Sequence, residues 1–277
     1  MEVAYPQVCS ALAQIDALIT PRRNALGFRS ALSGGLLSRT MMLDELALVL
    51  AQTRPAATLP EIDAAITKEN ILGKPTTSSR IKSYKHLVEL YGLDSGKALF
   101  RVLRKLAVLD PASLPTIALV CVFCRDPQLR TSFGLIRTLS LGEHLPRERM
   151  EAYLGSAFPE RFSPASLKSI AQNTSASWTS AGHLIGRIKK HRSHPTARPV
   201  AVGYAMLAGY LAGLRGHRLL TSEFAELATA QLSLIPGMLS IASARGMLGF
   251  KQAGGVIELD FSPLLTPQEL AFADVTD

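Results

Sequence analysis

The sequence predicts a mainly α fold, a helical bundle with helix-turn-helix or winged-helix elements and one or two small β-hairpins. Alanine and leucine dominate over valine, isoleucine and threonine, and this balance favours helices over sheets. The stretch from Ser163 to Pro199 has the order of a winged helix, because a capped helix is followed by a Gly182 stop and a short basic hairpin. Near the C-terminus the apolar residues change from a helical spacing to alternation, which predicts a terminal β-hairpin.

A chain of 277 residues is long enough for one large or two modest domains with a sizeable core. We expect three regions along it. Residues 1–92 form an N-terminal helical region with the helix-turn-helix, and residues 93–160 form a central helical scaffold. Residues 161–277 form a C-terminal helical region with the basic wing and the terminal hairpin.

Apolar spacing and breaker residues predict the helices of the N-terminal region. These helices cover 8–19, 41–52, a short span that begins at Pro60, and 76–90. Gly34-Gly35 and residues 70–73 are predicted turns. The helix over 76–90 is expected to bury one side, made of Ile81, Tyr84, Val88 and Tyr91.

The short helix, the turn and the longer helix over 76–90 make a helix-turn-helix candidate. No acidic residue lies between Asn70 and His86, and the longer helix begins with hydroxyl and cationic side chains. Serine can donate to phosphates or base edges, and arginine or lysine can reach phosphates or guanine. We therefore predict DNA contacts at Ser79, Arg80, Lys82 and Lys85. The alternative is a solvated helix face that binds nothing.

Four helices are predicted in the central region, over 95–109, 115–124, 129–139 and 146–154. The second of them is almost entirely apolar, which predicts a central, buried position. The first is amphipathic, and its cations are expected on the exposed side, at Lys97, Arg101, Arg104 and Lys105.

The helix in the stretch from Ser163 to Pro199 begins at Ser163 and Pro164. Serine can cap the first turn, and proline lacks the amide hydrogen that would be unsatisfied there. Its predicted buried side consists of Leu167, Ile170, Thr174, Trp178 and Ala181. The polar side carries no acid and can lie along a groove; it consists of Lys168, Gln172, Ser175 and Thr179. The wing is predicted to follow, with its strand over 183–188 and its tip over 189–198.

Nine cations lie between Glu160 and Glu223 without an intervening Asp or Glu. Since the whole chain has a formal net charge of +8, the remaining residues sum to about −1, and the basicity is local. A polyanion is the partner that such a segment favours. We predict DNA contacts on the helix and the wing, at Lys168, Gln172, Arg187, Lys189, Lys190 and Arg192.

The C-terminal region contains further helices before its hairpin. They are predicted over 200–214, 222–232 and 236–245, and in the first of them Ala205, Gly209 and Gly213 recur every fourth position, which lets another helix approach closely. Strands over 247–250 and 256–261 flank a Gly254-Gly255 turn. The acidic residues of this hairpin favour packing or protein contact over DNA, and the tail after Thr266 is expected to be loosely held.

Other chemistry has little support in the residue pattern. Cys121 and Cys124 have metal-ligand spacing but lie in an apolar run without a second ligand pair, so neither a metal nor another cofactor is predicted. Clustered carboxylates and a Ser-His-Asp arrangement are not apparent, which argues against an enzyme and a small-molecule substrate. Few cysteines, no basic segment before the first apolar run, and apolar runs shorter than about 18–20 residues indicate a cytoplasmic protein without a membrane partner.

Three short segments carry a resemblance to a known family: FRSALSGGLLS at 28–38, KENIL at 68–72 and TTSSRIKSY at 76–84. They resemble the BrxA family of DNA-binding accessory proteins from BREX (bacteriophage exclusion) defence islands, and the turn at 180–184 is similar too. The resemblance covers roughly residues 28–190. It implies a non-catalytic, mostly helical protein that binds duplex DNA, with Ser79, Arg80 and Lys82 facing the DNA.

The sequence and the resemblance together predict a non-catalytic double-stranded-DNA-binding accessory protein of a prokaryotic, BREX-like phage-defence system. Other proteins of the defence system are the expected protein partners. The alternative is a protein-interaction scaffold or a transcriptional regulator of the defence locus, in which the basic surface partly serves an acidic protein partner.

Overall fold

The computed structural model describes residues 21–29 and 35–274, so the helix predicted over 8–19 and the first glycine of the Gly34-Gly35 turn lie outside the described residues. Within these ranges, helices make up most of the chain and the strands form two small antiparallel sheets, which confirms the predicted fold class. One cluster of buried apolar side chains extends from Leu26 to Ala273.

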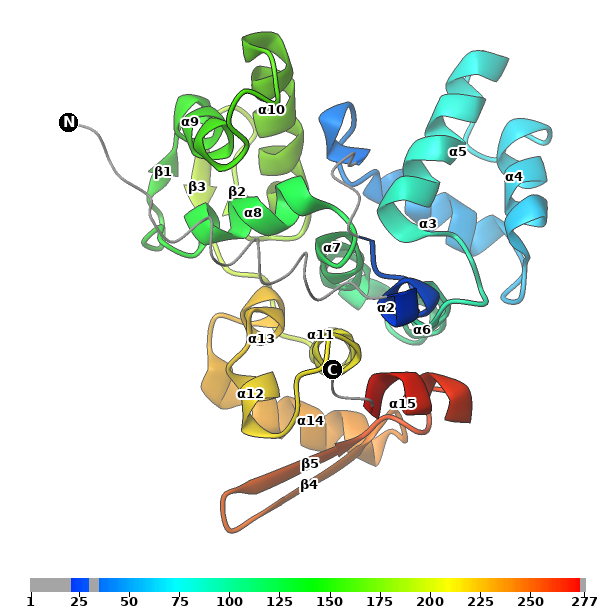
Figure 1. Ribbon diagram of the computed structural model, residues 1–277, viewed down its shortest axis with the longest axis vertical. Helices are drawn as coiled ribbons and strands as arrows, with labels where there is room; N and C mark the ends of the chain where they lie inside the picture. The colour runs from blue at the N-terminus through cyan, green and yellow to red at the C-terminus, as the bar shows by residue number, and fades with distance from the viewer. Residues whose placement is uncertain (1–20, 30–34, 275–277) are drawn as a thin grey trace.

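The N-terminal part, at the right of Figure 1, consists of α2 (Pro21–Leu26), the 3-10 helix η1 (Gly35–Leu37), α3 (Leu43–Gln52), α4 (Leu59–Thr67) and α5 (Thr77–Tyr91). Local capping explains where two of these helices begin. The Thr58 amide donates to Glu61 Oε2 at 2.7 Å before α4, and the Ser79 amide donates to the Thr76 hydroxyl at 3.1 Å before α5. Ile62, Ala65 and Ile66 of α4 are buried.

The buried side of α5 is rotated from the prediction. Ser83, Leu87, Leu90 and Tyr91 are buried, whereas Tyr84 and Val88 are only partly buried and Ile81 is 39% exposed. The Tyr91 hydroxyl donates to the Met41 carbonyl oxygen and so sets the rotation of the helix. At about 100° per residue, Ile81 then lies on the far side of Tyr91 from Leu87 and Leu90.

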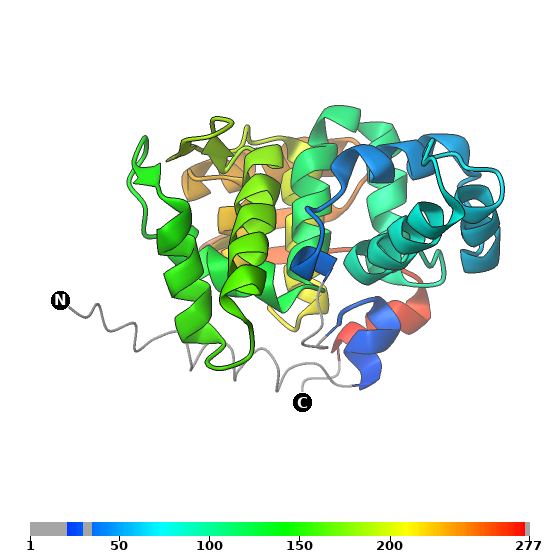
Figure 2. The same ribbon diagram turned by 90° about the horizontal axis from the view of Figure 1, so that it is seen from above.

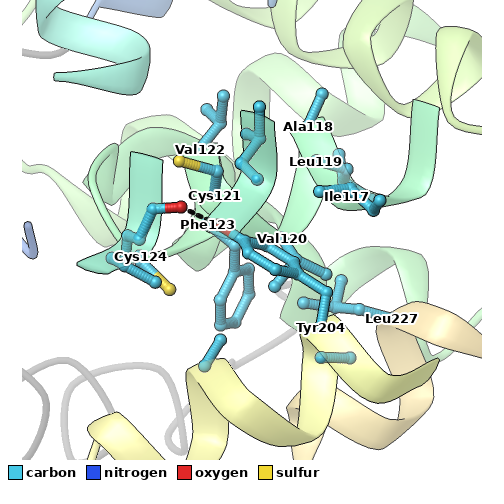
Figure 3. Close-up of a cluster of buried hydrophobic side chains, with 14 of the residues drawn as sticks. Ile117, Ala118, Leu119, Val120, Cys121, Val122, Phe123, Cys124, Tyr204 and Leu227 are labelled. Carbon is cyan, nitrogen blue, oxygen red and sulfur yellow. Dashed lines mark hydrogen bonds between the residues drawn. The ribbon is translucent and has the colours of Figure 1, made fainter. Parts of the chain in front are cut away.

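The centre of the molecule consists of α6 (Ala98–Leu109), η2 (Pro111–Ser113), α7 (Leu114–Phe123) and α11 (Pro199–Leu211). Figure 3 shows Tyr204 of α11 among the side chains of α7, and its hydroxyl also donates to the Leu99 carbonyl of α6 at 2.9 Å. A Cβ at Gly209 would lie 2.9 Å from Leu219, so the absence of a side chain there permits the close packing expected of this helix.

The exposed basic face predicted on α6 is wrong for Arg104. This side chain is buried and donates to the carbonyl and hydroxyl oxygens of Thr53. Thr53 ends α3, so the acceptors come from a helix that is distant in sequence. The spacing of residues within α6 therefore does not indicate that Arg104 is buried against Thr53.

A winged helix is formed by α8 (Pro127–Ile136), β1 (His144–Leu145), α9 (Arg147–Ala157), α10 (Pro164–Ser180), β2 (Leu184–Ile185) and β3 (Lys190–Arg192). The three strands form an antiparallel sheet in the order β1-β3-β2. Helix, strand, two helices and a closing hairpin whose second strand pairs with the first strand define this arrangement. The unit crosses the boundary predicted at 160/161, because α9 packs on α10; the three-region division remains a prediction.

Helix α10 begins where the sequence predicts. The Ser163 hydroxyl accepts a hydrogen bond from the Ser166 amide at 3.2 Å, and Pro164 is the first helical residue. Ile170, Thr174 and Trp178 are buried as expected. The predicted polar side is wrong at Ser175, which is buried.

The C-terminal part contains α12 (His217–Leu220), α13 (Glu223–Ala228), η3 (Leu232–Leu234), α14 (Ile235–Ala244), the hairpin β4 (Gly249–Ala253) and β5 (Val256–Asp260), and α15 (Pro267–Asp274). The hairpin predicted here is confirmed, and it extends away from the helices in Figure 1. Helix α13 ends earlier than predicted, because Thr229 is extended and its hydroxyl accepts from the Gln231 amide at 3.1 Å.

The expectation of a loosely held tail after Thr266 is wrong. Residues Pro267–Asp274 form α15, in which Glu269 pairs with Arg101 of α6. Glu269 also accepts a hydrogen bond from the Thr266 amide at 2.8 Å, and Arg215 donates to the carbonyl oxygen of Ala273. These contacts join the last described helix to the core, and their partners are too distant in sequence for a local pattern to indicate them.

Candidate nucleic-acid interface

Helix α10 presents an exposed polar face that is held in place from behind. Lys168 and Gln172 are both exposed, and they lie one turn apart on the same face. On the opposite face, the Trp178 indole donates to the Ser132 hydroxyl of α8 at 2.8 Å and stacks on Phe133 with ring centroids 5.5 Å apart. The buried contacts fix the position of the exposed pair on the surface of the helix.

The wing is shorter than predicted. Its tip is the turn between β2 and β3 at residues 186–189, while Lys190 and Arg192 belong to β3. Gly186 has φ of +100°, and a Cβ at this position would lie 2.0 Å from the Lys189 carbonyl oxygen, so the turn requires glycine. Arg187 and Lys189 are exposed at the tip. The Lys190 ammonium donates to the Gly186 carbonyl at 2.8 Å, and partial burial lowers its pKa.

Ile188 lies at the wing tip between the two exposed cations and is 91% exposed. It was not among the predicted contacts, because an isolated isoleucine in a basic segment gives no signal until the turn that exposes it is known. An exposed apolar side chain between cations can contact sugars and base edges in the minor groove.

Arg192 is a correction to the predicted site. Its guanidinium is buried, and Nη1 donates to the His183 carbonyl at 3.0 Å and to the Ser193 carbonyl. The His183 ring is also buried, with Nε2 3.1 Å from the Leu227 carbonyl oxygen and Nδ1 3.4 Å from Arg192. A neutral ring that donates from Nε2 and accepts at Nδ1 satisfies both contacts. Arg192 therefore stabilises the base of the wing and does not reach its surface.

The residues predicted on α5 divide into two groups. Lys82 and Lys85 are exposed. The Ser79 hydroxyl donates to the Thr76 carbonyl at 2.7 Å and Arg80 Nε donates to the Lys74 carbonyl at 3.3 Å, so both side chains take part in the start of the helix. Residues 68–76 connect α4 to α5, and this connection is longer than the turn of about three or four residues in a typical helix-turn-helix.

A hydrogen-bonded bridge at residues 35–42 joins α5 to α10. From α10, Asn173 donates to the Leu36 carbonyl at 3.2 Å and the Ser177 hydroxyl accepts from the Met41 amide at 2.9 Å. From α5, His86 contacts Ser38 at 3.3 Å in addition to the Tyr91 bond to Met41. In both ribbon views α10 lies between the wing sheet and α5 (Figures 1 and 2). The predicted DNA contacts on α5 and those on α10 therefore lie on helices that are joined by one hydrogen-bonded segment.

Several of the nine cations without a nearby acid in the sequence take part in structural contacts. Arg198 forms a bidentate pair with Asp110, with both N–O distances 2.8 Å. Arg215 lies over the Tyr210 ring, 3.7 Å from its centroid, and Arg192 and Lys190 donate to backbone carbonyls. Their partners lie on other helices or are backbone carbonyls, which a count of neighbouring acids does not detect.

The two cysteines among the described residues are part of the core. Cys121 and Cys124 are buried free thiols, and burial raises the pKa of Cys121 to about 11. Burial also raises the pKa of Cys124. Over residues 21–29 and 35–274, no three His, Cys, Asp or Glu side chains gather as metal ligands would. In the same ranges, no helix has the length and apolar character needed to cross a membrane.

No protein-family model and no curated protein sequence matches this chain. The resemblance to the BrxA family therefore remains a prediction from short segments. What the described residues contribute is geometric: a winged helix with an exposed polar face on its third helix and two exposed cations at its wing tip.

Proposed function

We propose that this protein binds double-stranded DNA through its winged helix, without catalysing a reaction on it. The observation that carries the proposal is the winged-helix arrangement of α8 to β3, in which the exposed face of α10 and the wing tip carry cations and no acid. A recognition helix of this kind enters the major groove, and the groups beside it contact phosphates.

Each part of the interface has its own role in the proposal. Lys168 and Gln172 face the groove from α10, where a glutamine can bond adenine and a lysine can reach guanine or phosphate. Arg187 and Lys189 hold the phosphates beside the groove, with Ile188 against the sugars between them. Lys82 and Lys85, with Arg80 behind them, form a second contact on α5.

The biological setting of the proposal comes from the resemblance alone. A BrxA-like protein would act as an accessory factor in a prokaryotic, BREX-like phage-defence system, together with other proteins of that system. Its cellular place would be the cytoplasm, where the DNA of the cell and of an invading phage is accessible.

The test is fluorescence anisotropy of the full chain with a labelled duplex, titrated at several salt concentrations. Contacts to about 4–6 phosphates predict a slope of log affinity against log salt near −4 to −5. A second titration with Lys168→Glu is expected to abolish most of the binding, because a carboxylate would then face the phosphates. Absence of binding at low salt would overturn the proposal.

A second candidate function is a protein-interaction scaffold or a regulator of the defence locus. The terminal hairpin favours it, since β4 and β5 extend away from the helices (Figure 1) and Val256 at the turn is 71% exposed. Co-purification of a protein partner that resists nuclease treatment, together with failure of the duplex titration, would support this alternative.

A further inference from the structure

A cavity of about 420 Å³ lies between the winged helix and the C-terminal helices. Its walls come from α2, α7 and α8 on one side and from the end of α11, α12 and α13 on the other. Cavities of roughly 300–1,000 Å³ are the usual size of small-molecule sites. The proposed DNA contacts on α10 and the wing do not line it, so the cavity is a separate feature of the molecule.

Part of the cavity lining is apolar and aromatic, and it comes from both sides. Phe123 and Phe224 meet edge to face with ring centroids 5.7 Å apart, and Phe28 and Leu214 extend this part of the lining. Phe224 and Leu214 are only partly covered by the protein, so part of their apolar surface faces the cavity. A flat aromatic or branched aliphatic group is the kind of ligand body that such a lining accommodates.

The charged part of the lining has an excess of positive charge, since it contains four arginines against two glutamates. Arg137 takes up much of the negative charge, because its guanidinium lies 2.6 Å from Glu226 and 3.4 Å from Glu223. Burial raises the pKa of Glu223. Arg218 is exposed at the mouth of the cavity, where it can meet an incoming anion.

We propose that this cavity binds a small organic anion with an apolar body, of the class of aromatic carboxylates and sulfonates. The anionic group would lie toward Arg218, and the body would lie against Phe224 and Leu214. Two lining residues come from the first helix of the winged helix: Arg130 lies in α8, and Arg137 directly follows its last residue. A bound ligand would therefore contact the winged helix and the C-terminal helices at the same time. The proposal does not depend on DNA binding.

The test uses two fluorescent probes on the full chain. 1-Anilinonaphthalene-8-sulfonate has an anionic group on an aromatic body, and N-phenyl-1-naphthylamine has nearly the same body without the charge. The native protein is expected to bind one sulfonate probe saturably. Ala212→Trp and Leu214→Trp, which fill the cavity from its lining, are each expected to weaken both probes at least about tenfold. Arg218→Glu is expected to weaken the sulfonate about tenfold and leave the neutral probe nearly unchanged.

Arg245→Glu is the matched control, because Arg245 is exposed at the end of α14 and does not line the cavity. It should leave both affinities unchanged. The proposal is overturned by non-saturable binding to the native protein, or by tryptophan variants that keep the native melting temperature and still bind both probes normally. If Arg218→Glu changed the affinity for the two probes equally, the proposal that the ligand is an anion would be wrong.

Discussion

His183 and Arg192 lie side by side beneath the wing, and both are buried. Burial, and after it the charge of Arg192, lowers the pKa of His183 from 6.5 to about 3. Between these two pH values the unfolded chain binds a proton that the folded protein excludes. The free energy of unfolding therefore keeps its full value above pH 6.5. As the pH falls toward 3, exclusion of this proton from the folded protein lowers it by about 1 kcal/mol per pH unit.

Urea unfolding measured from pH 7.5 to pH 4 tests this prediction, as the wild-type free energy of unfolding should fall across the window. His183→Gln keeps a donor for the Leu227 carbonyl and removes the titrating ring, so its stability should depend less steeply on pH. Equal slopes for the two proteins would show that His183 titrates normally in the folded state.

Arg192 leads to a second prediction at the same scale. Replacement by methionine keeps most of the side-chain volume but removes the donor of the Ser193 carbonyl and one of the two donors of the His183 carbonyl, which also accepts from the Ser193 amide; the loss should cost about 1–3 kcal/mol in unfolding free energy. Lys189→Met at the exposed wing tip is the control and should change stability little. If Arg192→Met instead keeps full stability and loses DNA affinity, the guanidinium contacts the DNA.

At the scale of the element, α10 and the wing show which patterns can be interpreted without a structure. The buried face of α10 is apparent in the sequence, because its period and its Ser163-Pro164 start are local properties. Strand β1 was not predicted, since it has two residues and its partner, Lys190–Arg192, lies over forty residues later. Without β1 the register of the wing is undetermined, and the tip was placed too far along the chain.

The wing tip carries the prediction that belongs to this scale. Arg187→Ala combined with Lys189→Ala removes two proposed phosphate contacts, so the slope of log affinity against log salt should become shallower by about 2. The affinity should fall by a similar factor for all DNA sequences, because phosphates carry no sequence information. Lys251→Ala combined with Arg245→Ala, two exposed cations outside the interface, is the matched control. Equal slopes for the wing variant and this control would remove the wing from the interface.

At the scale of the whole molecule, what could not be predicted depends on contacts between distant segments. A nearly continuous apolar run identified the central helix α7, and small residues identified the closely packed α11. The Asp110–Arg198 pair spans 88 residues, and the pair of Arg101 with Glu269 that orders the tail spans 168. Such pairs decide which cations remain available for a polyanion. The composition of a segment can therefore indicate a basic surface but not its extent.

The bridge at residues 35–42 gives the last prediction, that α5 and α10 contact one duplex together. Because both helices bond to the same short segment, their separation is fixed, and a long enough duplex can meet both. Lys82→Ala/Lys85→Ala and Lys168→Ala/Gln172→Ala are each expected to weaken binding to a duplex of about 30 base pairs, three helical turns. Since the two sites are separate, the free-energy losses should add in the fourfold variant. On a duplex of about 10 base pairs, one turn, only the α10 variant should lose affinity. Lys82→Ala/Lys85→Ala with unchanged affinity at every duplex length would show that α5 takes no part, and the winged helix alone would then bind the DNA.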